Sequence, residues 1–239
     1  MSESFRISGT TSLPFNSLDI AVIIPAYNES KFIEEVVTGV IEFTGFPVCV
    51  VDDASQDDTS QRAEQAGAVV IRHKKNQGKG GAHQTGFKWA LENNFQGIVV
   101  MDADGQHLPG EIKNFIIPDL INRSDIIIGC RKLKLNYMPW QRIFTNKLTS
   151  LVCSILAGQR INDSQSGFRY ISTEVIKNVK LKTTKFQTET ELIIRAARYG
   201  YLISQVEVST VYGREKSHIN PVVDTLRFLS LIGLLIREY

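Results

Sequence analysis

The sequence is poor in cysteine and contains no long apolar run. Its cysteines, Cys49, Cys130 and Cys153, are odd in number and lack C-x-x-C spacing, which argues against a disulfide framework and against a zinc site. We interpret them as buried thiols in a reducing compartment. No stretch approaches the roughly 18 apolar residues of a transmembrane helix, and no apolar segment before Ile20 would serve as a signal peptide. The expected location is therefore the cytoplasm.

An excess of charge of one sign is missing too. The 27 Lys and Arg residues nearly balance the 25 Asp and Glu residues, and the formal net charge is +2. This balance gives no polybasic signal for nucleic acid, so any anion binding must come from local clusters. With 239 residues, 43% of them hydrophobic, the chain fits one large α/β domain better than two small ones.

Strand-like and helix-like segments alternate along the chain. Helical patterns follow the first four of five short apolar runs, which lie at 20–25, 48–51, 68–71, 98–101 and 126–129. The first helix is expected at about 30–43, the second at 59–66 with Asp58 as its cap, and the fourth from Pro109 to about Asn122. Further helices are expected at 138–157 and 189–199, and further strands at 170–171 and 201–208. This alternation predicts a single α/β domain with a mostly parallel sheet flanked by helices. We divide the chain into a loose leader (1–18), this domain (19–220) and a terminal apolar helix (221–239).

Two carboxylates follow the central strand directly, in the run Asp102-Ala103-Asp104-Gly105-Gln106-His107. The carboxyl edge of an open α/β sheet is where its ligands bind. Alternate residues of an extended segment face the same way, so Asp102 and Asp104 can face one ion. Carboxylate oxygens suit Mg²⁺ or Mn²⁺, which complete their coordination with phosphates and water. We therefore expect a metal-diphosphate site here, the alternative being an ordinary acidic loop.

Other polar motifs fall at the same edge. After the first strand, a nucleotide base can stack on Tyr27, and Glu29 can accept from its donors; the alternative is a proline turn that caps a helix. The glycine-rich stretch around Lys79 offers backbone N–H groups and one ammonium to an anion. It is not a P-loop, and no G-x-G-x-x-G follows the first strand, so P-loop ATP hydrolysis and dinucleotide binding are disfavoured. Arg131, Arg169 and His218 add cations.

The candidates for a general base are Asp163, Glu189 and Glu191. The two glutamates lie two residues apart at a predicted helix start, so they cannot both face one point. Asp163 sits in a polar turn near Arg169 and is the preferred site residue.

Taken together, these motifs resemble the inverting glycosyltransferases of family 2, above all the polyprenyl-phosphate (dolichol-phosphate mannose synthase-like) members. Seven motifs match in order over roughly residues 18 to 220: Pro25-Ala26-Tyr27-Asn28-Glu29, Val51-Asp52-Asp53-Ala54-Ser55 with Asp58-Thr59, Asn76 with Gly78-Lys79-Gly80, the segment 102–107, Gly129-Cys130-Arg131, the segment 163–169, and Glu189-Thr190-Glu191-Leu192. The resemblance implies a GT-A type, Rossmann-like nucleotide-diphospho-sugar transferase fold.

The resemblance also implies roles for particular residues. Mg²⁺ or Mn²⁺ would be held by Asp102, Asp104 and Gln106, and the acceptor side would carry Asp163, Glu191 and Arg169 as catalytic residues. The nucleotide sugar would be bound by Pro25, Ala26, Tyr27, Glu29, Asp53, Lys79, Asp102, Ala103, Asp104, Arg131 and His218. Where related lipid-phosphate enzymes often carry an arginine and a Ser-Lys pair in the late loop, this chain has Tyr212 and Ser217-His218.

The expected activity is transfer of a sugar from a GDP- or UDP-sugar to an acceptor, with a polyprenyl phosphate favoured. The alternatives are a glycan or small-molecule hydroxyl as acceptor, nucleotidyl transfer with release of pyrophosphate, and a non-catalytic nucleotide-sugar-binding module. The segment 221–239 is apolar enough to pack on the domain, pair with a second copy or touch a membrane surface.

Overall fold

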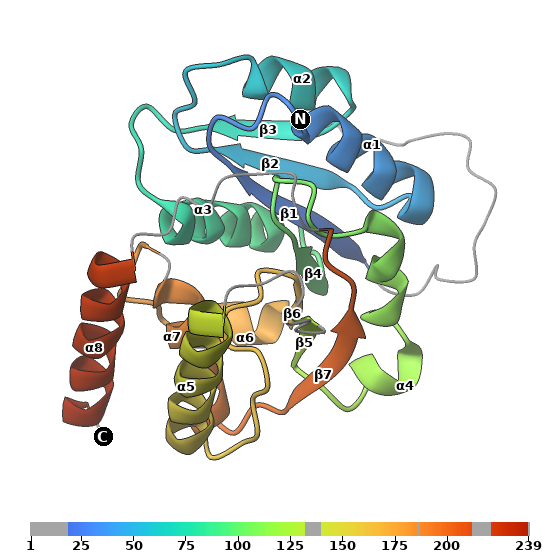
Figure 1. Ribbon diagram of the computed structural model, residues 1–239. Coiled ribbons are helices and arrows are strands. Elements are labelled where there is room, and N and C mark those ends of the chain that lie inside the picture. Colours follow the sequence, from blue (N-terminus) through green and yellow to red (C-terminus); the bar gives the residue numbers. More distant parts are fainter. Residues whose placement is uncertain (1–18, 132–139, 186, 212–220, 239) are drawn as a thin grey trace.

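The computed structural model describes residues 19–131, 140–185, 187–211 and 221–238. Within these ranges it shows one seven-stranded sheet of order β3-β2-β1-β4-β6-β5-β7 (Figure 1). The strands are β1 (Ile20–Ala26), β2 (Val48–Asp52), β3 (Val69–Arg72), β4 (Gly97–Val100), β5 (Ile126–Arg131), β6 (Arg169–Ser172) and β7 (Ile203–Val208). Every neighbouring pair is parallel except the two made by β6, which runs antiparallel between β4 and β5. The predicted mostly parallel sheet is confirmed.

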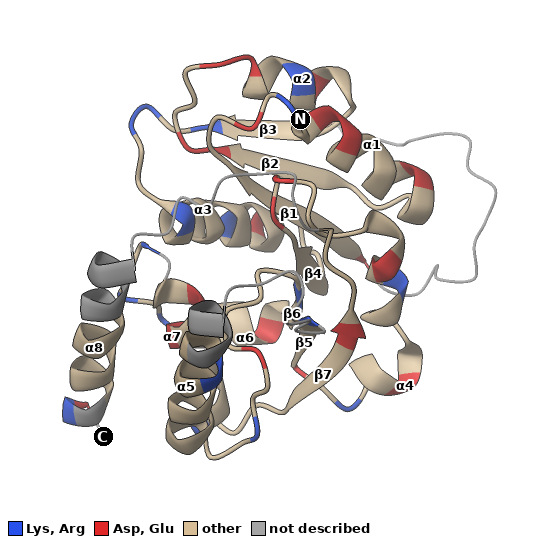
Figure 2. Ribbon diagram, in the orientation of Figure 1, with Lys and Arg blue, Asp and Glu red and all other residues tan. Residues whose placement is uncertain are grey.

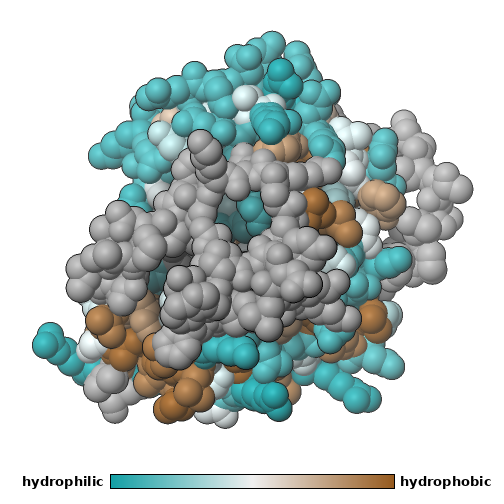
Figure 3. Space-filling model, viewed as in Figure 1, coloured by the Kyte–Doolittle hydropathy of each residue, from teal (hydrophilic) through white to brown (hydrophobic). Residues whose placement is uncertain are grey.

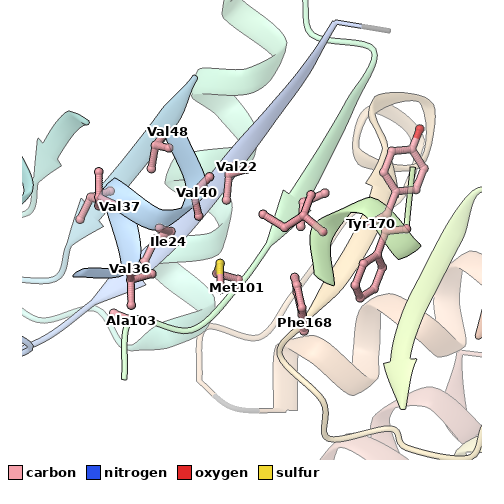
Figure 4. Close-up of a cluster of buried hydrophobic side chains, with 14 of the residues drawn as sticks. Val22, Ile24, Val36, Val37, Val40, Val48, Met101, Ala103, Phe168 and Tyr170 are labelled. Carbon is pink, nitrogen blue, oxygen red and sulfur yellow. The ribbon is translucent and has the colours of Figure 1, made fainter. Parts of the chain in front are cut away.

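Helices cover both faces of the sheet (Figure 1). Helices α1 (Ile33–Thr44), α2 (Thr59–Gln65) and α4 (Pro118–Ile121), with the 3₁₀ helix η1 (Pro109–Asn114), pack on one face. Helices α3 (Lys79–Glu92), α5 (Trp140–Ala157), α6 (Thr173–Asn178), α7 (Gln187–Arg198) and α8 (Pro221–Arg237) pack on the other. The alternation of strand side chains explains the division: Val22 and Ile24 point into the first core, shown in Figure 4, and Ile23 into the second.

Three local predictions need correction. The helix expected from Pro109 to Asn122 is two short helices, because Pro118 cannot donate a helical hydrogen bond and holds Ile117 in an extended conformation. Asp58 does not cap α2; the carboxylate of Asp57 accepts the Thr59 N–H instead, at 3.1 Å. Helix α6 was not expected. The remaining predicted helices and strands agree with the structure to within a few residues.

The order of the strands creates the place for a site. The chain moves outward from β1 to β2 and β3, then returns to put β4 on the other side of β1. The loops after β1 and β4 therefore lie next to each other at the carboxyl edge of the sheet, the usual ligand position in such sheets. Figure 2 shows acidic residues on the loop that follows β4.

In the part of the chain that the structure describes, no helix has the length and apolar character needed to cross a membrane.

Candidate active site

An ion cluster lies just beyond the carboxyl end of β4. The Nζ of Lys79, at the start of α3, lies 2.6 Å from Oδ1 of Asp102 and 2.8 Å from Oε1 of Glu189, in the first turn of α7. His107 is buried, with Nε2 3.6 Å from the other Asp102 oxygen. Two carboxylates from distant parts of the sequence thus share one ammonium.

The electrostatics of the cluster keep its charges in place. Burial opposes ionisation of Asp102, but Lys79 and His107 outweigh it and hold the pKa of Asp102 well below its usual range. Burial likewise opposes the charge on Lys79, and Asp102 and Glu189 overcome it, so the pKa of Lys79 is raised. Nearby His83 has a pKa lowered to about 4, chiefly by burial, and is neutral at pH 7.

Gly167, which lies just before β6, allows the backbone there to approach this cluster closely. A Cβ placed on Gly167 would lie 2.5 Å from Oδ2 of Asp102 and 2.7 Å from Oδ1. The backbone before β6 therefore forms one wall of the carboxylate site, and only a residue without a side chain fits there.

The second acidic residue, Asp104, is half-buried beside the first. Burial raises its pKa, and the negative charge of Asp102 raises it further. Its Oδ1 accepts the Gln106 N–H at 3.0 Å. A divalent cation would relieve the repulsion between the two carboxylates, and oxygen donors are the ligands it prefers, so Asp102, Asp104 and the amide oxygen of Gln106 fit such an ion. Ala103, between them, is buried in the core on the opposite side.

Asp53 organises the glycine-rich loop. Its carboxylate accepts the N–H groups of Gln77 and Gly78 at 2.8 and 2.7 Å, and lies 2.7 Å from Nδ1 of His73. It is 3% exposed. These bonds fix the backbone just before α3. Asp53 therefore positions Lys79, the first residue of that helix.

Hydrogen bonds join the loops after β1 and β2, at the place where the sequence predicts a nucleotide base. Pro25 and Ala26 are the last residues of β1 and are buried, whereas Tyr27 is 45% exposed. The backbone N–H of Asn28 donates to Ser55, and that of Glu29 donates to Thr59. Tyr27 is thus the member of the motif that presents a ring to solvent.

A second ionic group lies at the carboxyl end of β5. Arg131 donates to both oxygens of Asp163, at 2.7 and 2.9 Å, and Asn146 of α5 also donates to that carboxylate. Burial alone would raise the pKa of Asp163, but its bonds with Arg131 lower it. Asp163 is therefore an ionised partner of Arg131 in this arrangement.

Arg169 and Glu191 lie inside the protein. Arg169 is 2% exposed and donates to the carbonyl oxygens of Ser164 and Glu189. Glu191 is completely buried, accepts the N–H groups of Lys182 and Thr183, and pairs with Arg195 at 2.7 Å. The structure does not bring Glu191 to the Asp102 cluster; Glu189 lies there instead. His218 lies outside the described residues.

Comparison with known proteins identifies the chain. Residues 21–181 match the family model described as glycosyl transferase family 2. The chain belongs to this family. Its activity is therefore glycosyl transfer.

Two known glycosyltransferases are similar to the chain over most of their length. A UDP-N-acetylglucosamine–dolichyl-phosphate N-acetylglucosaminyltransferase of Methanococcus voltae is 31% identical over 215 residues, covering 81% of this chain and 86% of the relative. An undecaprenyl-phosphate mannosyltransferase of Micrococcus luteus is 28% identical over 204 residues, covering 80% and 83%.

A solved structure shows the same fold. Glucosyl-3-phosphoglycerate synthase from Mycobacterium tuberculosis, crystallised with Mn²⁺ and UDP-glucose, superposes with a TM-score of 0.71 at 20% identity, covering 94% of this chain and 85% of that one. The predicted GT-A type fold is confirmed.

Several residues of this family 2 site were not among the predicted site residues, and Glu189 and Asn146 are two of them. Glu189 was considered only as a base, and its position two residues before Glu191 signalled that the two carboxylates face different surroundings. Asn146 carries no local signal, because it lies within an apolar helix 17 residues before its partner Asp163.

Proposed function

We propose that this glycosyltransferase moves a sugar, with inversion, from a GDP- or UDP-sugar to a polyprenyl phosphate. The observation that carries the choice of acceptor is the state of the candidate bases. Asp163 is paired through both oxygens with Arg131, Glu191 is buried among internal donors, and Glu189 is paired with the ammonium of Lys79. An acceptor hydroxyl needs a base to remove its proton, whereas a phosphate monoester is already largely ionised at pH 7.

On the donor side, Tyr27 would stack on the base, and the ion cluster would receive the diphosphate. Asp102, Asp104 and Gln106 would hold Mg²⁺ or Mn²⁺. Such an ion, when bound, neutralises charge on the departing diphosphate. Lys79, seated by the Asp53 loop, would add a second positive charge at the same oxygens.

On the acceptor side, we assign Arg131 to the attacking phosphate, in place of the nucleotide-sugar role that the family resemblance implied. Its side chain is 19% exposed, and the guanidinium is oriented by the bidentate bond to Asp163. The planar fork suits a phosphate as well as a carboxylate, and this chemistry fits Arg131 to the acceptor. Asp163 would then position Arg131 and take no proton.

An apolar surface supports a lipid acceptor. On α5, Leu148, Leu151 and Ile155 are 49%, 57% and 70% exposed, and the spacing of three and four residues puts them on one face. On α8, Leu229 is 58% exposed. Figure 3 shows hydrophobic surface in the lower left of the view, the region of α5 and α8 in Figure 1. We infer that this surface and the segment 221–239 contact the membrane that holds the lipid.

The test is the release of nucleoside diphosphate from a panel of UDP- and GDP-sugars, with and without an isoprenoid phosphate and with Mg²⁺, Mn²⁺ or EDTA. Wild type is compared with Asp104→Ala and with Asp119→Ala, which removes an exposed carboxylate of α4. Release that needs the lipid phosphate, the cation and Asp104, and survives Asp119→Ala, supports the proposal.

Other outcomes identify the alternatives. Release only with a sugar hydroxyl acceptor would overturn the lipid proposal. Pyrophosphate release from a nucleoside triphosphate would indicate nucleotidyl transfer. Tight donor binding without release for any acceptor would favour a binding module.

A further inference from the structure

The ammonium of Lys79 is paired with Asp102, the carboxylate that would also bind the divalent cation. Its Nζ is 2.6 Å from Oδ1 of Asp102, so an approaching cation meets a positive charge already in place. The contact is sheltered, since the Lys79 and Asp102 side chains are 18% and 25% exposed. At such exposure, solvent screens the repulsion between two cations only partly.

Glu189 provides a second position for the same ammonium. Its Oε1 lies 2.8 Å from Nζ of Lys79, and its side chain is 9% exposed. Lys79 can therefore leave Asp102 and keep an ion pair. The backbone carbonyl of Glu189 accepts from buried Arg169, which fixes the first turn of α7 at this point.

We propose that Lys79 is a built-in counter-ion that competes with the divalent cation for Asp102, and that Glu189 retains the displaced ammonium. This proposal rests on the proposed function, because it concerns the donor site of that reaction. In the absence of nucleotide, Lys79 weakens cation binding. When cation and nucleoside diphosphate bind together, the displaced ammonium gains the diphosphate oxygens, so the two ligands bind cooperatively.

The two residues should affect cation binding in opposite directions. Lys79→Gln removes the competitor, and we expect Mn²⁺ alone to bind at least about tenfold more tightly. Glu189→Gln leaves Lys79 with Asp102 as its carboxylate partner in this cluster, and we expect Mn²⁺ alone to bind several-fold more weakly. A defect in local folding would weaken binding in both variants.

The experiment measures free Mn²⁺ by electron paramagnetic resonance during titration of the whole chain, first without nucleotide and then with UDP or GDP. Lys79→Arg keeps the charge and should bind Mn²⁺ within a few-fold of wild type. Lys88→Gln removes an exposed lysine of the same helix and should change nothing. With the nucleotide present, wild type should gain Mn²⁺ affinity, and Lys79→Gln should gain less.

Unchanged or weaker Mn²⁺ binding by Lys79→Gln, or shifts of the same sign in both variants, would overturn the inference. Neither result depends on sugar transfer. Failure of the proposed function would appear separately, as the absence of lipid-dependent diphosphate release in the turnover assay.

Discussion

Gly167→Ala tests the geometry of the carboxylate site most directly. The added Cβ would stand 2.5 Å from Oδ2 of Asp102, whereas ordinary contacts begin at 3.4 Å, so the two must separate by 3.4 − 2.5 = 0.9 Å. The carboxylate cannot move freely, because Lys79 holds its other oxygen at 2.6 Å. Part of the separation must therefore come from Asp102 and part from the backbone before β6.

Two effects of different size follow. Overpacking of this kind costs about 1 to 3 kcal/mol, which lowers Tm by several degrees in a domain of this size. Displacing a ligand-binding group by nearly 1 Å reduces catalysis by about a hundredfold. We expect kcat/KM for the nucleotide sugar to fall far more than stability does.

Thermal unfolding and initial-rate kinetics measure the two effects. Gly233→Ala is the matched control, because a Cβ there meets nothing within 4 Å and lies within helix α8, where alanine is favoured over glycine. A Gly167→Ala enzyme with wild-type Tm and kcat/KM within about twofold of wild type would refute the reasoning about the wall beside Asp102.

Three further predictions concern buried groups. The pKa of His83 is about 4 in the folded protein, below its usual 6.5, so its contribution to stability is present above pH 6.5 and is lost as pH falls toward 4. In urea titrations, wild type should lose stability more steeply than His83→Gln over this range, by up to about 1.4 kcal/mol per pH unit, and parallel curves would contradict the assignment. Burial raises the pKa of Cys49 and of Cys153 to about 12, so iodoacetamide at pH 8 should label neither in the folded protein and both in urea, as followed by mass spectrometry. Asp163→Asn should reduce the rate with a lipid phosphate by about tenfold and leave the shape of the pH-rate profile unchanged, because it misplaces Arg131; a loss above about a thousandfold would assign Asp163 as the base instead.

The strand and helix order could be predicted because hydrophobic periodicity is a local property. The apolar run 20–25 became β1 with one residue added. Of the three thiols predicted to be buried, Cys49 and Cys153 are 0% exposed, whereas Cys130 is only half-buried. The failure at Pro118 is also local, since a proline inside an expected helix is itself a signal of its end. The antiparallel direction of β6 had no such signal, because strand direction depends on pairing with β4 and β5.

The sequence by itself determined the motifs and the family: carboxylates after the central strand, a glycine loop with one lysine, and a late Asp-x-x-x-Gly-Phe-Arg segment are readable as they stand. Tertiary structure alone decided which side chains meet. Lys79 and Glu189 lie 110 positions apart, yet they share an ion pair because α3 and α7 pack on the same face of the sheet. The packing of α7 also put Glu191 among internal donors, and the pairing of β5 with β6 brought Asp163, in the segment before β6, to Arg131. Periodicity assigns a side chain to a face of its own element, but only the packing of elements decides which charge stands opposite it.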